Sequence, residues 1–216
     1  TSEEYLASPY ICNAISLNAH VIISQTDITY FSPSVQIVQE RNKKILYFGA
    51  DYICYNMLPE SVKVELARQV EQISAFVQRR GYRGVIGIDF ILKDHQIFFV
   101  EFNARFQTSS QLLNKALWNS QRISLQELNL NAFSGDPIIR VEPCEVNYSN
   151  YTYSNSNISM ARLKRISTSP EVLFIQKDGY DPDDPFPSEP DVYLNRFVFG
   201  RNICSIQNNQ TILHPN

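Results

Sequence analysis

The pattern that most constrains the fold is a pair of apolar runs at residues 85–92 and 97–103, joined by the polar stretch Lys93-Asp94-His95-Gln96. Short apolar runs around a polar connection are typical of an antiparallel hairpin. By the period of two, residues 86, 88, 90 and 92 of the first run and residues 98, 100, 102 and 106 share an apolar face. The pattern therefore predicts a hairpin with one face packed in a core.

The other face of this hairpin carries side chains suited to chemistry. Asp89 and Glu101 lie opposite each other if the pairing is symmetric about a loop with an odd number of residues. Asn103 and Arg105 follow on the same face. Two carboxylates and an amide oxygen suit Mg²⁺ that phosphates also hold, and a guanidinium can stabilise charge on a transferring group. The alternative is an ordinary solvated strand face.

Around the hairpin the sequence predicts an α+β fold, with helices on one face of a mixed or antiparallel sheet. Residues 15–23 alternate as a half-buried strand, and a second strand-like run at 28–38 is interrupted by Pro33. Apolar residues recur at helical spacing from Pro59 to Gly81, and a second helical stretch spans about 110–133. The predicted order is β, β, α, β, β, α.

Charge and cysteine spacing exclude several classes of protein. The 216 residues include 19 basic and 22 acidic side chains, a net charge of −3, which argues against nucleic-acid and anionic-membrane binding. No apolar run approaches the ~20 residues of a membrane span. The four cysteines form no Cys-x-x-Cys pair, so a reduced, cytoplasmic protein is expected.

The last 79 residues, 138–216, are expected to form a small C-terminal β-rich extension. The polar stretch 147–157 has no apolar periodicity and is predicted to be a long loop. A second loop, 178–191, is rich in proline and acidic residues, and strand-like runs flank it at 171–176 and 192–199.

The segment around the carboxylates closely resembles the ATP-grasp superfamily, and within it the biotin-carboxylase-like branch. Further matches follow in register along residues 1–137. In chain order the matching segments are Ser2-Glu3-Glu4-Tyr5-Leu6, Leu17-Asn18-Ala19-His20-Val21, Ser34-Val35-Gln36, residues 81–90, residues 100–107 and residues 123–135. The resemblance implies the nucleotide-closing, C-terminal half of an ATP-grasp domain.

The resemblance also implies roles for particular residues. Asp89, Glu101 and Asn103 would bind two Mg²⁺ ions, or Mn²⁺, with Glu101 bridging them. Arg105 would contact the substrate carboxylate or acyl-phosphate as the catalytic residue. ATP would be held by Glu3, Glu4, Leu6 and Gln36.

Ser109 stands where biotin carboxylases have the glutamate that handles bicarbonate. The resemblance therefore implies an ATP- and Mg²⁺-dependent ligase that joins a small carboxylate to an amine. The alternatives are a carboxylating enzyme like biotin carboxylase or carbamoyl-phosphate synthase, and a non-catalytic module that binds a nucleotide or a partner. The family's N-terminal half is expected in cis or on a separate chain, with the isolated chain inactive. A homodimer is a further alternative.

Overall fold

The computed structural model describes residues 9–41, 44–134, 139–142, 144–154, 172–177 and 192–213. Along the chain, two pairs of helices separate three groups of strands. In order the elements are β1 (Ile15–Ile23), β2 (Ile28–Tyr30), β3 (Ser34–Arg41), β4 (Lys44–Asp51), α1 (Tyr52–Asn56), α2 (Glu60–Arg79), β5 (Gly84–Lys93), β6 (Gln96–Asn103), α3 (Ser110–Gln121), α4 (Leu125–Ser134), β7 (Tyr148–Ser154), β8 (Val172–Lys177), β9 (Val192–Phe199), β10 (Cys204–Gln207) and β11 (Gln210–Leu213).

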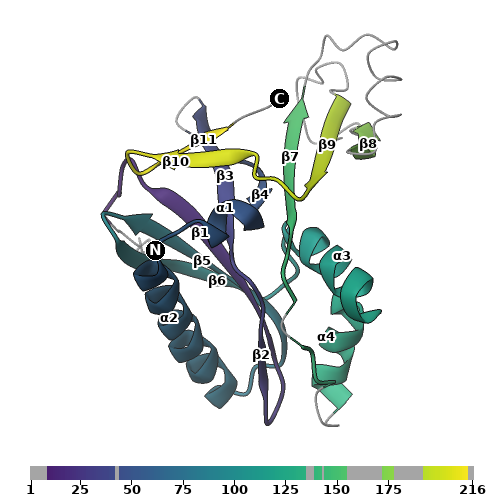
Figure 1. The fold of residues 1–216 in the computed structure, drawn as a ribbon. Helices are drawn as coiled ribbons and strands as arrows, with labels where there is room; N and C mark the ends of the chain where they lie inside the picture. Colours follow the sequence, from purple (N-terminus) through teal and green to yellow (C-terminus); the bar gives the residue numbers. More distant parts are fainter. Residues whose placement is uncertain are drawn as a thin grey trace, which may run out of the picture.

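One large sheet organises the molecule. Its strands run in the order β6-β5-β1-β3-β4-β7-β9-β8, and β2 pairs with β1. Every strand pairing within the described ranges is antiparallel. A separate hairpin of β10 and β11 completes the strands (Figure 1). The α+β class with an antiparallel sheet is confirmed.

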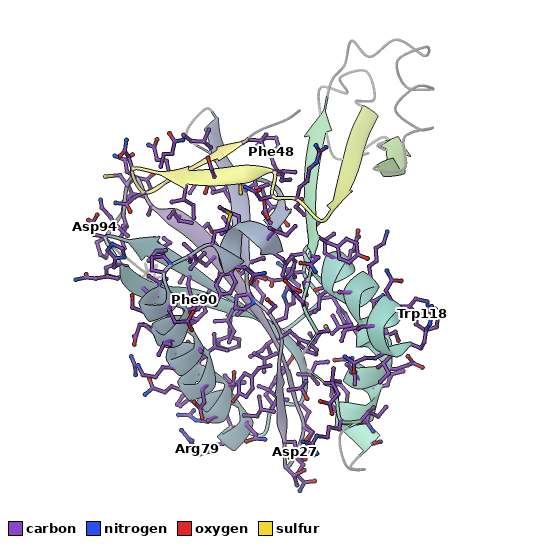
Figure 2. All side chains as sticks on the ribbon, viewed as in Figure 1. Asp27, Phe48, Arg79, Phe90, Asp94 and Trp118 are labelled. Atoms are coloured by element: carbon purple, nitrogen blue, oxygen red, sulfur yellow. The ribbon has the colours of Figure 1, made fainter. Side chains whose placement is uncertain are left out.

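The helices cover both faces of the sheet, which differs from the expectation that they pack on one face. Leu66 of α2 lies in a core cluster with Leu17 of β1. Leu113 of α3 lies in a second cluster with Val85 of β5. Figure 1 shows α2 on one side of the sheet and α3 with α4 on the other. Figure 2 shows side chains filling the layer between the sheet and α2, where Phe90 is labelled.

Because both faces are covered, β1 is buried at every position except Ser16 rather than half-buried. Its alternate apolar residues, from Ile15 to Ile23, lie in the cluster with α2, as the alternation predicts, while Ile22 lies in the cluster with α3 and α4. Its polar residues Asn18 and His20, expected to face outward, are 0% and 1% exposed. The predicted alternation of β1 is therefore correct, but its polar face is buried, whereas the sequence predicted that it faces outward.

The helix predicted from Pro59 to Gly81 is confirmed. Pro59 precedes its first residue, and Gly81 follows it with a φ of +85°, a conformation that glycine adopts without strain. The break predicted at Pro33 is also present, because Pro33 lies between β2 and β3.

The second helical stretch is two helices rather than one. Arg122 ends α3 in the left-handed conformation, with a φ of +58°. The Ser124 backbone N–H donates to Glu127 Oε2 at 2.7 Å, and the Glu127 N–H donates to Ser124 Oγ at 3.1 Å. This reciprocal capping box starts α4. The predicted end near residue 135 lies outside the described residues.

The C-terminal strands extend the same sheet. The stretch predicted as a loop at 147–157 contains β7, which pairs with β4 and β9. Tyrosine and threonine favour extended backbone, and Tyr148 is buried in the cluster of α3 and α4, so the expectation of a loop is wrong there. The strand-like runs correspond to β8 and β9, and the loop 178–191 lies outside the described residues. The domain boundary at 137/138 stays a prediction.

The hairpin of β10 and β11 is fixed to the sheet through Asp51. This buried carboxylate accepts the Cys54 N–H at the start of α1 at 2.8 Å. Its second oxygen accepts the N–H groups of Ile203 and Cys204 at 2.7 and 3.1 Å. One side chain at the end of β4 therefore caps a helix and holds the hairpin. None of the described helices is long and apolar enough to cross a membrane.

Candidate functional site

A β-bulge places the two predicted carboxylates opposite each other. Phe90 pairs with Phe99, a register that would put Val100 opposite Asp89. The register shifts between Asp89 and Phe90, so that Asp89 pairs with Glu101 instead. The turn between β5 and β6 has an even number of residues, and the one extra residue of the bulge does what the predicted odd loop would have done.

The bulge also sets which aromatic residue of β6 lies beside Phe90. Phe99 pairs with Phe90, and their ring centroids are 6.1 Å apart, although Phe99 is itself 47% exposed. Phe98, Val100 and Phe102 are 38%, 50% and 45% exposed, because β6 is the edge strand of the sheet. The predicted packed face is therefore present on β5 but incomplete on β6.

Asp89 lies at the centre of a ring of carboxamides. Its Oδ1 accepts from Asn18 Nδ2 at 2.7 Å and from Gln36 Nε2 at 3.0 Å. Its Oδ2 accepts from Asn103 Nδ2 at 2.9 Å and from Gln107 Nε2 at 3.2 Å. These donors come from β1, β3, the end of β6 and the segment after it. Neutral amides hold the carboxylate in place without neutralising its charge, so it remains available to a cation.

Glu101, Asn103 and Arg105 form the open side of the site. Asn103 Nδ2 donates to Glu101 Oε1 at 3.2 Å as well as to Asp89, so the two carboxylates share one positively polarised partner. Arg105 Nη2 donates to Asn103 Oδ1 at 3.3 Å. Asp89 is half-buried, whereas Glu101 and Arg105 are exposed. The structure thus brings together the four hairpin residues that the sequence singled out.

The donor set fits a hard divalent cation. It offers carboxylate and amide oxygens, which Mg²⁺ prefers, and two carboxylates are enough where phosphates supply further ligands. The described part of the chain contains no cluster of three or more His, Cys, Asp or Glu side chains that could hold a metal alone. Asp89, Glu101 and Asn103 are therefore the residues that would hold such an ion, with phosphate oxygens completing its shell.

Burial raises the pKa of Asp89 above its usual range, and the charge of Glu101 raises it further. Hydrogen bonds from Asn18, Gln107 and Gln36 lower it in part. A protonated carboxyl is a poor metal ligand, so affinity for a cation at this site should fall as the pH falls through the pKa of Asp89.

Gln107 reaches Asp89 because Gly87 leaves room on β5. A Cβ added at Gly87 would lie 1.7 Å from Gln107 Oε1. That same oxygen accepts from Asn18 Nδ2 at 2.7 Å. The side-chain amide of Gln107 therefore lies against Gly87 of β5, where it contacts both Asp89 and Asn18.

We expect Gly87→Ala to displace Gln107 and to weaken the order of the Asp89 carboxylate while the sheet stays intact. A steric conflict this close cannot be relieved without moving the amide. We predict a loss of about tenfold in affinity for Mn²⁺·nucleotide, the size of one lost charge-assisted hydrogen bond. Titration calorimetry on the full-length protein measures it. The opposing result is unchanged affinity in a folded variant. The control glycine substitution is Gly81→Asn, because a Cβ there would meet no atom within 4 Å and asparagine tolerates the left-handed backbone after a helix better than alanine.

The residues predicted to hold ATP fall into two groups. Glu3, Glu4 and Leu6, predicted to hold adenine, lie outside the described residues. Gln36, predicted to lie near the nucleotide, belongs to the cluster: it lies on β3 and donates to Asp89, while its oxygen accepts from Ser16 Oγ.

Sequence reasoning gave Asn18 and Gln107 no role at the carboxylates. Both residues stood in the matched segments, and Asn18 lies on the polar face of β1. Asn18 lies next to Asp89 because the two residues pair between β1 and β5. A prediction of that strand pairing would have identified Asn18 as a partner.

The α+β fold with an antiparallel sheet agrees with what comparison with known proteins finds. A family model for the ATP-grasp domain matches residues 1–109, and the chain belongs to this family. No curated protein sequence matches the chain.

Solved structures with a similar fold are distant in sequence. The L-amino acid ligase from Bacillus licheniformis has a TM-score of 0.66 at 15% identity, with 88% of this chain and 48% of that chain covered. Biotin carboxylase from Campylobacter jejuni, in a beta-gamma-ATP complex, has a TM-score of 0.58 at 15% identity, with 89% of this chain and 43% of that chain covered. N5-carboxyaminoimidazole synthetase from Staphylococcus aureus has 0.53 at 14%, covering 85% and 46%. The chain thus spans less than half of each.

Proposed function

We propose that this chain is part of an ATP- and Mg²⁺-dependent ligase that activates a small carboxylate as an acyl-phosphate and joins it to an amine. The observation that carries the proposal is the pairing of Asp89 with Glu101, with Asn103 held between them and Arg105 held by Asn103. This is a cation site with a guanidinium at its edge, as transfer of a phosphoryl group requires.

The proposed reaction has two steps. A substrate carboxylate oxygen attacks the γ-phosphorus of ATP, the bond to the β–γ bridging oxygen breaks, and ADP leaves. The amine nitrogen then attacks the acyl carbon and releases phosphate, and the amine loses a proton. Bound Mg²⁺ supplies charge neutralisation at the phosphates. Asp89 and Glu101 hold that charge in place, and Arg105 orients the substrate carboxylate and offsets charge on the transferring group.

The surroundings of Ser109 favour amine ligation over carboxylation. Ser109 is 2% exposed, and its Oγ donates to Asn18 Oδ1 at 3.2 Å. A buried hydroxyl engaged in this way offers no acid or base to a bicarbonate ion. The similarity in fold to an L-amino acid ligase supports the same direction.

The proposal includes parts that lie outside this site. Glu3, Glu4 and Leu6 would hold adenine, and Gln36 would lie near the ribose or phosphates. Residues 1–137 would be the nucleotide-closing half of the domain, and the other half would be supplied in cis or by a separate chain. Two Mg²⁺ ions, or Mn²⁺, and a cytoplasmic location complete the proposal.

A thermal-shift screen of ATP·Mg²⁺ with amino acids and other small carboxylates and amines, on the full-length protein, tests this function. We expect one carboxylate and one amine to raise the melting temperature with ATP and to release phosphate together. ATP binding without turnover for any pair would favour a nucleotide-binding module instead. Phosphate release that needs bicarbonate would favour a carboxylating enzyme.

We predict that Arg105→Lys lowers kcat by more than about tenfold while the KM for ATP changes less than about twofold. Lysine keeps the charge but loses the planar fork that meets two oxygens at once, and charge that develops in the transition state is affected more than ground-state binding. Steady-state kinetics of phosphate release measure both values. A large rise in KM at constant kcat would make Arg105 an ATP-binding residue.

A further inference from the structure

A buried polar pair lies beneath the segment that carries Arg105. His20 on β1 and Ser110, the first residue of α3, are 1% and 4% exposed. His20 Nε2 lies 2.9 Å from Ser110 Oγ. Ser110 Oγ in turn accepts the backbone N–H of Gln107 at 2.9 Å. A side chain in the middle of the sheet is thus linked, through one hydroxyl, to the backbone of the site.

The linked backbone belongs to the connection between β6 and α3, residues 104–109. Arg105 lies in this connection, and its N–H donates to Asn103 O at 2.8 Å. The Gln107 side chain binds Asp89 and Asn18. Three contacts therefore hold this connection. The Arg105 N–H bonds to the end of β6, the Gln107 side chain bonds to Asp89, and the Gln107 N–H bonds to Ser110 Oγ.

Ser110 Oγ forms two hydrogen bonds. It accepts from Gln107 N–H, and it shares a second bond with His20 Nε2, whose donor is set by the imidazole tautomer. The other ring nitrogen, His20 Nδ1, has no hydrogen-bond partner among the described residues. Nε2 is thus the ring atom through which His20 acts on its surroundings. An apolar side chain here would leave the buried hydroxyl of Ser110 without this partner.

We propose that His20 is a positioning residue for the ligase reaction: through Ser110 it fixes the backbone at Gln107 and so holds Arg105 and Gln107 against the paired carboxylates. The inference rests on the proposed function for its catalytic meaning. Its structural part, the link from His20 to the Gln107 backbone, stands independently of turnover.

The test compares four variants. His20→Leu removes the hydrogen-bond partner of Ser110, and His20→Gln keeps an amide that can accept from or donate to Ser110. Ser110→Ala breaks the same link from the other side with a small residue. Ser74→Ala is the matched control, since Ser74 is a buried serine that donates to Val70 O at 2.6 Å within α2, away from the site.

Two measurements are made on these variants. Amide hydrogen exchange by NMR reports the protection of the Gln107 N–H, and kinetics of the full-length protein report kcat and the KM for ATP. In His20→Leu and Ser110→Ala we expect the exchange rate of the Gln107 N–H to rise about tenfold and kcat to fall about tenfold, the effect of one lost hydrogen bond. The KM for ATP should stay within about twofold of the wild-type value. His20→Gln should restore both values, and Ser74→Ala should change neither.

The inference is overturned if folded His20→Leu or Ser110→Ala keeps wild-type protection at Gln107. It is also overturned if Ser74→Ala loosens Gln107 equally, because the effect would then be a general loss of stability, or if His20→Gln is as impaired as His20→Leu. Should His20→Leu not fold, Ser110→Ala decides. Exchange requires no turnover, so a wild-type protein without ligase activity overturns the proposed function and leaves the exchange result to decide on the link.

Discussion

Glu101→Gln is expected to lower Mg²⁺-dependent ATP hydrolysis by the full-length protein at least about 100-fold, while the fold is retained. The substitution removes one of two anions at the cation site and leaves a neutral amide of the same shape. A catalytic cation contributes several kcal/mol of charge stabilisation, and losing half of its protein charge is enough for a change of this size. Glu101 is exposed, so its loss should alter the free energy of unfolding by no more than about 0.5 kcal/mol.

Phosphate release measures the activity, and circular dichroism measures the melting temperature. Glu71→Gln is the matched control, because Glu71 is an exposed glutamate on α2, away from the carboxylates. It should leave both quantities unchanged. If Glu101→Gln keeps near-normal turnover, the assignment of the metal site to the hairpin is wrong.

The sequence predicted the two carboxylates on one hairpin because local alternation is a short-range property. It did not predict the bulge between Asp89 and Phe90. The prediction required an odd loop, whereas an even turn and one extra residue give the same pairing. A bulge shifts the alternation of apolar and polar residues by one position. That shift cannot be seen where the strand is apolar at every position, as in Phe98-Phe99-Val100.

The carboxamides around Asp89 were harder to predict, because they depend on long-range pairing. Asn18 and Gln107 are 71 and 18 residues away from Asp89 along the chain. Alternation on β1 identified a polar face but could not show that α3 covers it. A polar face under a helix has the same sequence pattern as a polar face under solvent.

The break between α3 and α4, in contrast, had a local signal. Ser124 and Glu127 have the spacing of a capping box, which marks a helix start. Continuous helical periodicity across residues 110–133 outweighed it in the sequence. Capping residues inside an apparently continuous helix are therefore stronger indications of a boundary than periodicity alone.

The second large effect expected is a loss of stability in acid that depends on His20. Burial lowers the pKa of His20 from 6.5 to about 4. The imidazole of His20 therefore takes up a proton near pH 6.5 in the unfolded chain, but only near pH 4 in the folded chain. The contribution of His20 to stability is complete above pH 6.5 and is lost as the pH falls toward 4, by about 3 kcal/mol in all.

Two other titratable side chains, Asp89 and Tyr52, lie on this face of the sheet. The raised pKa of Asp89 acts in the opposite direction, since the folded state binds its proton more tightly, and Tyr52 stays neutral because burial raises its pKa.

The contribution of His20 is isolated by comparing the wild type with His20→Gln in urea unfolding from pH 7.5 to pH 4.5. Asp89 and the surface carboxylates titrate in both proteins, so they cancel in the difference. Wild-type stability should fall relative to the variant by about 2 kcal/mol by pH 5, because glutamine has no proton to gain. Ser74→Ala should follow the wild type with a constant offset, since it removes a buried hydrogen bond but no titrating group. Parallel curves for wild type and His20→Gln would mean that folding leaves the pKa of His20 unchanged, and the prediction of a buried imidazole that stays neutral in the folded state would be wrong.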